Sequence, residues 1–278
     1  MKICILGLGQ VGLPTAKYAL EKGLEVWGYD INAQAVANAR KQGILNATSA
    51  YMKIPRVDAY LICVTTSLKG NVPNLSAIFE VCKKISENPH DPSALICVES
   101  TVLPGTCRKI FEEIFQKQVH VAHVPHRYWA ENSREHGVNQ LRVIGAVNEK
   151  SLDKCYKLYK ETLEIPLHKV WPIEVAEMCK IAENAYRYVQ IAFAEELRMN
   201  CEEHGLNFNK VRDACNTKWN IDMPDARDGI GGTCLPKDTR YLASLTRSNR
   251  LLESAMSLND VYTKWTANRT NAAKQSRK

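Results

Sequence analysis

Short apolar runs alternate with amphipathic stretches along the first two-thirds of the chain. The apolar runs are rich in β-branched residues, which is typical of buried strands. They predict strands at Lys2–Leu6, Glu25–Tyr29, Ala59–Val64, Ala94–Glu99, Val119–Ala122 and Arg142–Gly145. Helical spacing between them predicts helices at Leu13–Lys22, Ala33–Lys41, Leu75–Glu87 and Cys107–Lys117. This alternation favours an α/β fold with a Rossmann-like, doubly wound parallel sheet.

The pattern changes after Pro166 and Trp171-Pro172. Apolar residues then recur every three or four positions from Ile173 to Glu203, which predicts one long helix that His204-Gly205 ends. Shorter helices are predicted around Asn209–Asn216 and Asp238–Met256. We therefore expect a Rossmann-like domain over 1–170, a mostly helical domain over 171–263, and a basic, disordered tail over 264–278.

Composition indicates the compartment and the partners to expect for the protein. The ten cysteines are scattered singly, and no signal peptide or apolar run of membrane-spanning length is seen, so we expect a cytoplasmic protein with reduced thiols and no membrane partner. The formal net charge of +7 is compatible with nucleic acid. No basic stripe with interleaved aromatic residues accompanies it, so we attribute the charge to the tail and to an anionic ligand and expect no nucleic-acid partner.

A glycine-rich loop follows the first predicted strand. Gly7-Leu8-Gly9-Gln10-Val11-Gly12 opens the first predicted helix, and Asp30 ends the second strand. In a dinucleotide-binding loop these glycines allow a tight turn, close approach to the pyrophosphate and close helix packing, while an acid at the second strand binds the ribose. Asp30 would repel a 2′-phosphate, so the pattern predicts NAD as the cofactor.

Hydroxyl side chains gather after two other predicted strands. Thr65-Thr66-Ser67 follows one strand, and Ser100-Thr101 with Thr106 follows another. Ligands of open α/β sheets bind beyond the carboxyl ends of the strands, so these residues are candidate cofactor contacts. Serine and threonine are equally common as helix caps, and their spacing leaves both interpretations open.

A second glycine-rich segment, Gly231 to Asp238, predicts a glycine-flanked loop that holds Cys234 near Lys237. A thiol with open access and a positive neighbour can act as a thiolate nucleophile. Paired with a dinucleotide, such a thiol suits the oxidation of an alcohol past the aldehyde to the acid, because it can hold the aldehyde as a thiohemiacetal.

Lys180 and Asn184 are four residues apart on the long helix and therefore share a face. Glu177 and Glu183 lie on the same turns. Spacing alone favours a solvated face; the alternative is that Lys180 and Asn184 point toward Cys234. A metal site at His120, His123 and His126 is not expected, because a spacing of three along a strand sends neighbours to opposite faces.

Together, these motifs resemble those of the UDP-glucose/GDP-mannose dehydrogenases, which convert a nucleotide sugar to its uronic acid with NAD. The resemblance runs from Met1 to Leu258. It rests on Gly7–Gly12, Gly28–Asp30, Ser100-Thr101, Pro104–Thr106, Ala176–Asn184, Glu202–Leu206 and Gly231–Asp238. Arg142–Gly145 and Glu177–Ala194 are more similar to the branch that oxidises UDP-N-acetylhexosamines such as UDP-N-acetylmannosamine.

The resemblance implies a role for each matching residue. Cys234 would be the nucleophile, Lys180 and Asn184 would stabilise the oxyanion, Asp238 would orient water or move a proton, and Thr101 would lie between nicotinamide and substrate. The implied cofactor contacts are Gly7, Gly9, Gln10, Val11, Gly12, Asp30, Thr65, Thr66, Ser67 and Thr101. The implied substrate contacts are His126, Arg127, Lys180, Asn184, Gly231, Gly232 and Lys237. The family also associates through its helical region, which predicts a homodimer.

Three departures from the family leave two functions open. Pro125-His126 stands where the family usually has Pro-Glu, and the resemblance implies that this glutamate acts as a base in thioester hydrolysis. Glu195-Glu196 replaces a common Asn-Glu pair. The family also continues into a second Rossmann-like domain that holds the UDP group, and this chain stops before it. The chain is therefore a naturally short relative, a fragment, or one part of a split enzyme whose separate subunit supplies the UDP-binding domain. It is either an active NAD-dependent nucleotide-sugar 6-dehydrogenase or an impaired NAD-binding remnant with a regulatory or scaffold role.

Overall fold

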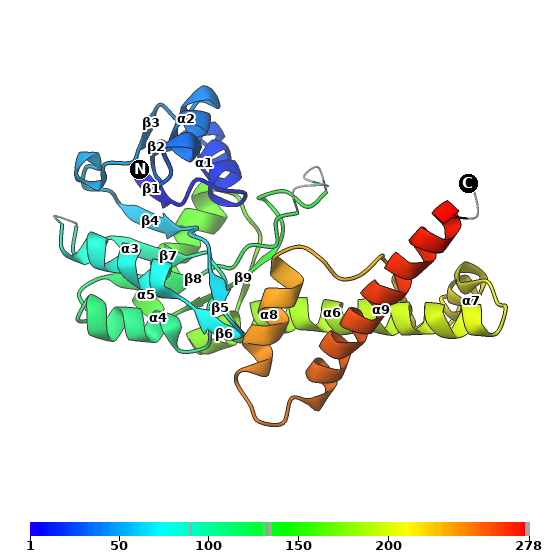
Figure 1. Cartoon of the computed structure of the whole chain (residues 1–278). Coiled ribbons are helices and arrows are strands. Elements are labelled where there is room, and N and C mark those ends of the chain that lie inside the picture. The colour runs from blue at the N-terminus through cyan, green and yellow to red at the C-terminus, as the bar shows by residue number, and fades with distance from the viewer. Residues whose placement is uncertain (89–90, 130–131, 133–134, 276–278) are drawn as a thin grey trace. The chain divides into compact units, whose positions relative to one another are not determined.

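The computed structural model describes residues 1–88, 91–129, 132 and 135–275 (Figure 1). Contacts between residues divide the chain into two compact units. The first unit comprises Met1–Lys69 and Asn74–Lys180, and the second comprises Gly70–Pro73 and Ile181–Lys278. The division falls within the long helix, after Lys180, rather than at Trp171-Pro172 where the sequence changes pattern.

An eight-stranded sheet forms the centre of the first unit, in the order β10-β9-β8-β7-β4-β1-β2-β3. Its strands are β1 (Lys2–Leu6), β2 (Glu25–Tyr29), β3 (Asn46–Thr48), β4 (Ala59–Ile62), β7 (Leu95–Val98), β8 (His120–His123), β9 (Arg142–Ala146) and β10 (Leu167–Lys169). All neighbouring pairs are parallel except β8 and β9. The strand order reverses between β1 and β4, and ligands of open α/β sheets bind at such a point.

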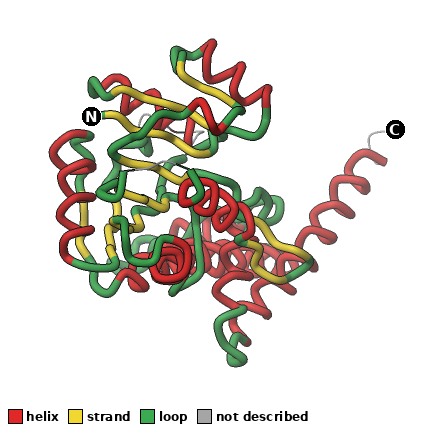
Figure 2. The backbone as a smooth tube through the Cα atoms, turned by 90° about the vertical axis from the view of Figure 1, so that its left-hand side faces the viewer, coloured by secondary structure: helices red, strands yellow, loops and turns green. Residues whose placement is uncertain are grey.

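Helices cover both faces of this sheet (Figure 2). They are α1 (Gly12–Glu21), α2 (Ala33–Lys41), α3 (Ser76–Ser86), α4 (Thr106–Lys109) with a π-helical turn (Ile110–Ile114), and α5 (Glu149–Tyr156) with a π-helical turn (Lys157–Thr162). Strand β1 shows why two cores form, because its side chains alternate between the faces. Ile3 and Ile5 belong to one buried cluster, and Cys4 and Leu6 belong to the other.

This architecture confirms the predicted Rossmann-like fold. The structure adds β3, β10, α5, a 3₁₀ turn (Tyr51–Lys53), and a separate two-stranded sheet of β5 (Ser67–Lys69) and β6 (Val72–Asn74). The added strands are too short to show a clear alternation of apolar and polar residues. The helix predicted at Cys107–Lys117 ends earlier, because Gln116 and Lys117 have positive φ angles of 49° and 64°.

The second unit is helical. It contains most of α6 (Ile173–Glu203), together with α7 (Phe208–Cys215), α8 (Cys234–Ala243) and α9 (Arg250–Gln275). Buried apolar residues of α6 pack with Ile230 and Ala255 in one cluster and with Phe208 in another. The bounds of α6 are those predicted from its apolar spacing.

Two expectations for the end of the chain differ from the structure. The predicted helix Asp238–Met256 is divided into α8 and α9, because polar side chains between them bond to the backbone: Thr246 accepts from the amide of Ser248, and Asn249 donates to the carbonyl of Ala243. Residues 264–275 are part of α9 rather than a disordered tail. Arg269 there forms an ion pair with Glu202 and lies over the Trp265 ring, which ties this part of α9 to α6.

No described helix is both long enough and apolar enough to cross a membrane.

Candidate functional site

The loop between β1 and α1 is built around positions where a side chain cannot fit. Gly7 has φ of 95°, its amide donates to the Tyr29 carbonyl at 2.8 Å, and a Cβ there would lie 2.7 Å from the Cys63 carbonyl oxygen. A Cβ at Gly12 would lie 1.8 Å from the Gly7 carbonyl oxygen. A Cβ at Gly9 would meet nothing within 4 Å, so the loop is open there. This open, glycine-lined cradle before the first turn of α1 fits a dinucleotide pyrophosphate.

Hydrogen bonds to the Asp30 carboxylate connect this loop to the end of β2. Asp30 Oδ2 accepts from the amide of Leu8 at 2.7 Å, and its Oδ1 accepts from the amide of Asn32 at 2.8 Å. These two bonds fix the carboxylate beside the glycine loop, as ribose binding by an acid at this position requires.

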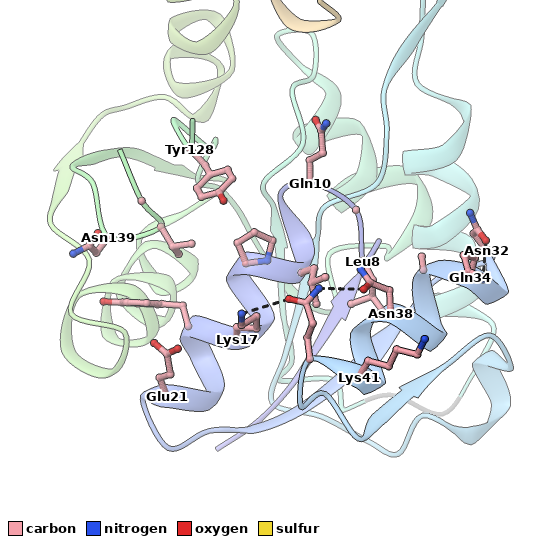
Figure 3. A pocket seen from close by; sticks show the side chains of 18 residues that line it. Leu8, Gln10, Lys17, Glu21, Asn32, Gln34, Asn38, Lys41, Tyr128 and Asn139 are labelled. Atoms are coloured by element: carbon pink, nitrogen blue, oxygen red, sulfur yellow. Dashed lines mark hydrogen bonds between the residues drawn. The ribbon is translucent and has the colours of Figure 1, made fainter. Parts of the chain in front are cut away.

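A cavity of about 900 Å³ lies beside the loop, between α1 and α2 and next to Tyr128 and Asn139 (Figure 3). It shares Gly9 and Gln10 with the loop. Lys17 of α1 donates to Gln42 at 3.4 Å, and Gln42 donates to Asn38 of α2 at 3.2 Å, which links the cavity walls.

The hydroxyl groups beyond β4 and β7 have local backbone partners. Ser100 donates to the Val64 carbonyl at 2.6 Å, and Thr106 donates to the Leu103 carbonyl at 2.6 Å. Thr65 and Ser67 are exposed, Thr66 is buried and Thr101 is half-buried. Their roles as cofactor contacts stay predictions.

Glu177 has a structural role that helix spacing did not reveal. It is fully buried rather than on a solvated face. Its Oε2 accepts from the amide of Gly105 at 2.6 Å and its Oε1 from the amide of Cys107 at 2.7 Å, so it caps α4 from another helix. Burial raises the pKa of Glu177, and the amides of Cys107 and Gly105 oppose that shift.

Glu99, immediately after β7, is the centre of a buried polar cluster that sequence analysis missed. Its carboxylate contacts His126 Nε2 at 2.5 Å, Arg142 Nη1 at 3.3 Å and Cys63 Sγ at 3.2 Å, and it also accepts from the Tyr159 hydroxyl. Burial by itself would raise the pKa of Glu99, but His126 and Arg142 beside it lower the pKa to about 2. A charged residue at the end of a fully apolar strand is the one signal in the sequence that pointed here.

His126 faces this cluster. Its Nε2 also lies 2.9 Å from the Thr15 hydroxyl, and its Nδ1 is buried without a partner among the described residues. Burial, together with Arg142, lowers the pKa of His126 to about 4, so the imidazole is neutral near pH 7. Arg127, next along the chain, donates to the Leu141 carbonyl at 2.9 Å.

The ligand atoms of Cys63, Glu99 and His126 lie within 4.8 Å of one another, which suggests a metal site. Burial raises the pKa of the Cys63 thiol well above its ordinary value. Arg142 already balances the charge of Glu99. A hydrogen-bonded network therefore accounts for the cluster better than a metal centre does.

Cys234 lies in the second unit as the first residue of α8, and it is the exposed cysteine among the ten. Gly231 and Gly232 before it are also exposed, and Gly232 has φ of 77°. The sequence predicted a loop around this thiol; the structure places it at the start of a helix instead. The first turn of a helix offers free amide groups and a positive dipole end.

Asp238 lies one helical turn after Cys234 and is buried. Its Oδ2 accepts from Asn184 Nδ2 at 2.5 Å, and its Oδ1 accepts from Lys237 Nζ at 2.5 Å. Lys237 also lies 4.4 Å from the centre of the Tyr241 ring. The structure thus brings Asn184, Lys237 and Asp238 together, and Lys180 lies one turn before Asn184 on α6.

Comparison with known proteins identifies the family. Residues 33–163 match the NAD binding domain of the UDP-glucose/GDP-mannose dehydrogenase family, and residues 174–261 match its central domain. The chain belongs to this family. Its NAD-binding domain includes Thr101 and His126, and its central domain includes Lys180, Asn184 and Cys234.

Individual relatives agree with this assignment. The UDP-N-acetyl-D-mannosamine dehydrogenase of Methanococcus vannielii is 31% identical over 281 residues, covering 93% of this chain and 65% of the relative. The protein of that name from Salmonella typhi is 29% identical and covers 98% of this chain and 72% of the relative. The solved UDP-D-ManNAc dehydrogenase of Pyrococcus horikoshii superposes with a TM-score of 0.88 at 28% identity, over 100% of this chain and 72% of that one. The chain thus spans about two-thirds of the length of these family members.

Proposed function

We propose that the protein oxidises a nucleotide sugar at C6 to the uronic acid, with NAD as oxidant and Cys234 as a covalent nucleophile. The observation that carries this proposal is the placement of Cys234: an exposed thiol at the start of α8, one turn before an Asp238 held by Asn184 and Lys237. Membership of a dehydrogenase family supports the reaction class. Relatives named for UDP-N-acetyl-D-mannosamine favour a UDP-N-acetylhexosamine as substrate, with UDP-glucose as the second candidate.

In the proposed reaction, NAD accepts the hydride in each of two oxidation steps. Loss of the first hydride and a proton converts the C6 alcohol to an aldehyde. Cys234 Sγ then adds to the aldehyde carbon, and its proton passes to the oxygen to give a thiohemiacetal. Loss of the second hydride and of the hydroxyl proton gives a thioester. Water then cleaves its C–S bond, releases the acid and returns a proton to Cys234.

Residues of the chain stabilise the developing charge, orient water and hold the cofactor. Lys180 and Asn184 stabilise negative charge on the sugar oxygen, and Asp238 holds Asn184 and Lys237 in place and orients water. Gly9, Gln10 and Val11 hold the pyrophosphate, and Asp30 holds the ribose. The remaining predicted contacts are Thr65, Thr66, Ser67 and Thr101 for the cofactor, and Arg127, Gly231 and Gly232 for the substrate.

One observation favours a second function, that of an impaired NAD-binding subunit. His126, where the family usually has a glutamate, is committed to Glu99 and Thr15 inside the first unit. With that base withdrawn, hydrolysis of the thioester would be slow.

The test is to incubate the protein with NAD and a panel of UDP-sugars and to follow NADH. We expect NADH and the uronic acid, detected by mass spectrometry, with a UDP-N-acetylhexosamine, and no uronic acid from Cys234→Ser, which should still bind NAD. Cys215→Ser, a change at a half-buried cysteine of α7, is the matched control and should behave as wild type. Uronic acid formation that survives Cys234→Ser would reject the covalent mechanism, and NAD binding without NADH from any sugar would favour the second function.

A further inference from the structure

The segment that leads into Cys234 is anchored at Gly229 and Ile230. The Gly229 amide donates to Glu195 Oε1 of α6 at 3.2 Å, and the Ile230 amide donates to Asn259 Oδ1 of α9 at 2.6 Å. The Ile230 side chain is buried among Tyr188 and other apolar residues. The exposed residues that follow, up to Cys234, depend on this anchor for their starting position.

Gly229 lies too close to α9 for a side chain. Its φ is 100°, and a Cβ there would lie 2.8 Å from Thr263 Oγ1. The backbone conformation at the anchor is therefore restricted by its contacts with Glu195 of α6 and with Asn259 and Thr263 of α9.

Burial of a carboxylate such as Glu195 at this anchor is energetically unfavourable. Glu195 is fully buried, and its second oxygen, Oε2, has no hydrogen-bond partner among the described residues. The nearest cation on α6, Arg198, is engaged by Glu202 at 3.6 Å, by Asp228 at 3.5 Å and by the Tyr262 hydroxyl at 3.0 Å. A buried carboxylate with an unsatisfied oxygen and no dedicated cation is destabilised when it is ionised.

The groups that face Glu195 define its titration. They are Arg198 and Tyr188 of α6, Arg227 and Asp228 of the preceding loop, and Tyr262 of α9. Burial raises the pKa of Glu195 to about 7, while the Gly229 amide and the two arginines oppose the shift. Glu195 therefore changes charge near neutral pH.

We propose that Glu195 is a positioning residue for Cys234, and that ionisation of Glu195 loosens the Gly229–Ile230 anchor. The inference rests on the proposed role of Cys234 for its catalytic meaning. The anchor itself is a property of the second unit, independent of cofactor and substrate.

The sign of the effect follows from linkage. Opening the anchor exposes the carboxyl group to water and returns its pKa toward the ordinary 4.5. Between that value and about 7 the closed form holds a proton that the open form has lost, so the open fraction rises with pH by up to about tenfold per unit. Above about pH 7 both forms are ionised and the rise levels off.

Hydrogen exchange of peptides that contain Gly229 and Ile230 tests the anchor. Exchange is measured without cofactor from pH 5.5 to pH 8.5 and corrected for the intrinsic rate. We expect protection to fall with rising pH in the wild type and to be independent of pH in Glu195→Gln. Glu196→Gln, the same change at the exposed neighbouring residue, should follow the wild type. If Glu195→Gln does not fold, Glu195→Asn takes its place with the same expectation.

Alkylation of Cys234 by iodoacetamide, quantified by peptide mass spectrometry, tests the link to the thiol. Ionisation of Cys234 itself is common to both proteins, so the ratio of wild-type to Glu195→Gln rates isolates the effect of Glu195. We expect this ratio to change across pH 5.5–8.5, and the ratio of wild type to Glu196→Gln to stay constant. Equal pH dependence of exchange in wild type and Glu195→Gln, or a constant alkylation ratio, overturns the proposal. Both results stand whether or not the protein oxidises a sugar.

Discussion

At the scale of single residues, we expect Asp30 to set the choice of cofactor. Its carboxylate is held by the amides of Leu8 and Asn32, so it cannot turn away from a 2′-phosphate without breaking both bonds. We expect NAD to bind more tightly than NADP, and Asp30→Ala to weaken NAD binding and narrow the difference. Calorimetric titration with both cofactors measures this; equal affinity in the wild type would show that Asp30 lacks this role.

Buried histidines give the first unit an acid sensitivity. Burial lowers the pKa of both His123 and His126 to about 4 from 6.5. The folded state then binds fewer protons than the unfolded state between these values. Stability is therefore present above pH 6.5 and is lost as pH falls toward 4, at up to about 1.4 kcal/mol per pH unit for each histidine.

Urea unfolding from pH 4.5 to pH 7.5 measures this slope. His123→Gln and His126→Gln should each reduce the slope of unfolding free energy against pH by up to about 1.4 kcal/mol per pH unit, the contribution of one bound proton. His204→Gln, at an exposed residue, should leave this slope unchanged. Variants at both buried positions with the wild-type slope would contradict the proposed cause.

Residues also show where sequence reasoning ends. The glycine loop and Asp30 were predictable because a local turn and one neighbouring strand define them. Glu99 was not, because its partners His126, Arg142 and Tyr159 are 27, 43 and 60 residues away and meet it only in the folded sheet. His126 was identified from its place in a motif, but its burial against Glu99 depends on that fold.

At the scale of elements, α4 depends on a cap from α6. Glu177 accepts from two amides at the start of α4, and its removal would leave both without that partner. We expect Glu177→Ala to lower the free energy of unfolding by about 2–4 kcal/mol. Glu196→Ala, at an exposed residue of the same helix, should stay within about 0.5 kcal/mol of wild type. Denaturant unfolding measures the free energy of unfolding of both variants. Equal decreases would show that Glu177 does not cap α4.

Elements were predictable where the periodicity is long. The bounds of α6 follow from thirty-one residues of regular apolar spacing. The break between α8 and α9 does not, because it depends on Thr246 and Asn249 bonding to the backbone in competition with the helix.

At the scale of the whole molecule, association is the first expectation to test. The long helix exposes large apolar side chains at Tyr186 and Phe193, with exposed fractions of 67% and 56%. These two residues are seven apart and so lie on one face of the helix; exposed apolar side chains gathered on one face are typical of an interface, and we expect a homodimer. Light scattering at micromolar concentration should give twice the 31.3 kDa chain mass. Tyr186→Lys with Phe193→Lys should reduce it to the monomer mass, and a wild-type monomer would contradict the expectation.

The family was predictable from the sequence because its motifs occur in order along the whole chain. The choice between active enzyme and impaired subunit was not, because it depends on whether the thioester is hydrolysed. His126 is held by Glu99 and has a pKa of about 4, so it is a poor base in this position.

The most direct test of the account is to mix the protein with NAD and UDP-N-acetylhexosamine and measure NADH and intact protein mass together. We predict a burst of about two NADH per chain, slow turnover afterwards, and a sugar nucleotide retained on Cys234 as the thioester. Cys234→Ser should show no mass increase. Linear turnover without a burst or adduct would show that another base replaces the usual glutamate. NAD binding with neither NADH nor an adduct, across all UDP-sugars, would contradict the central claim.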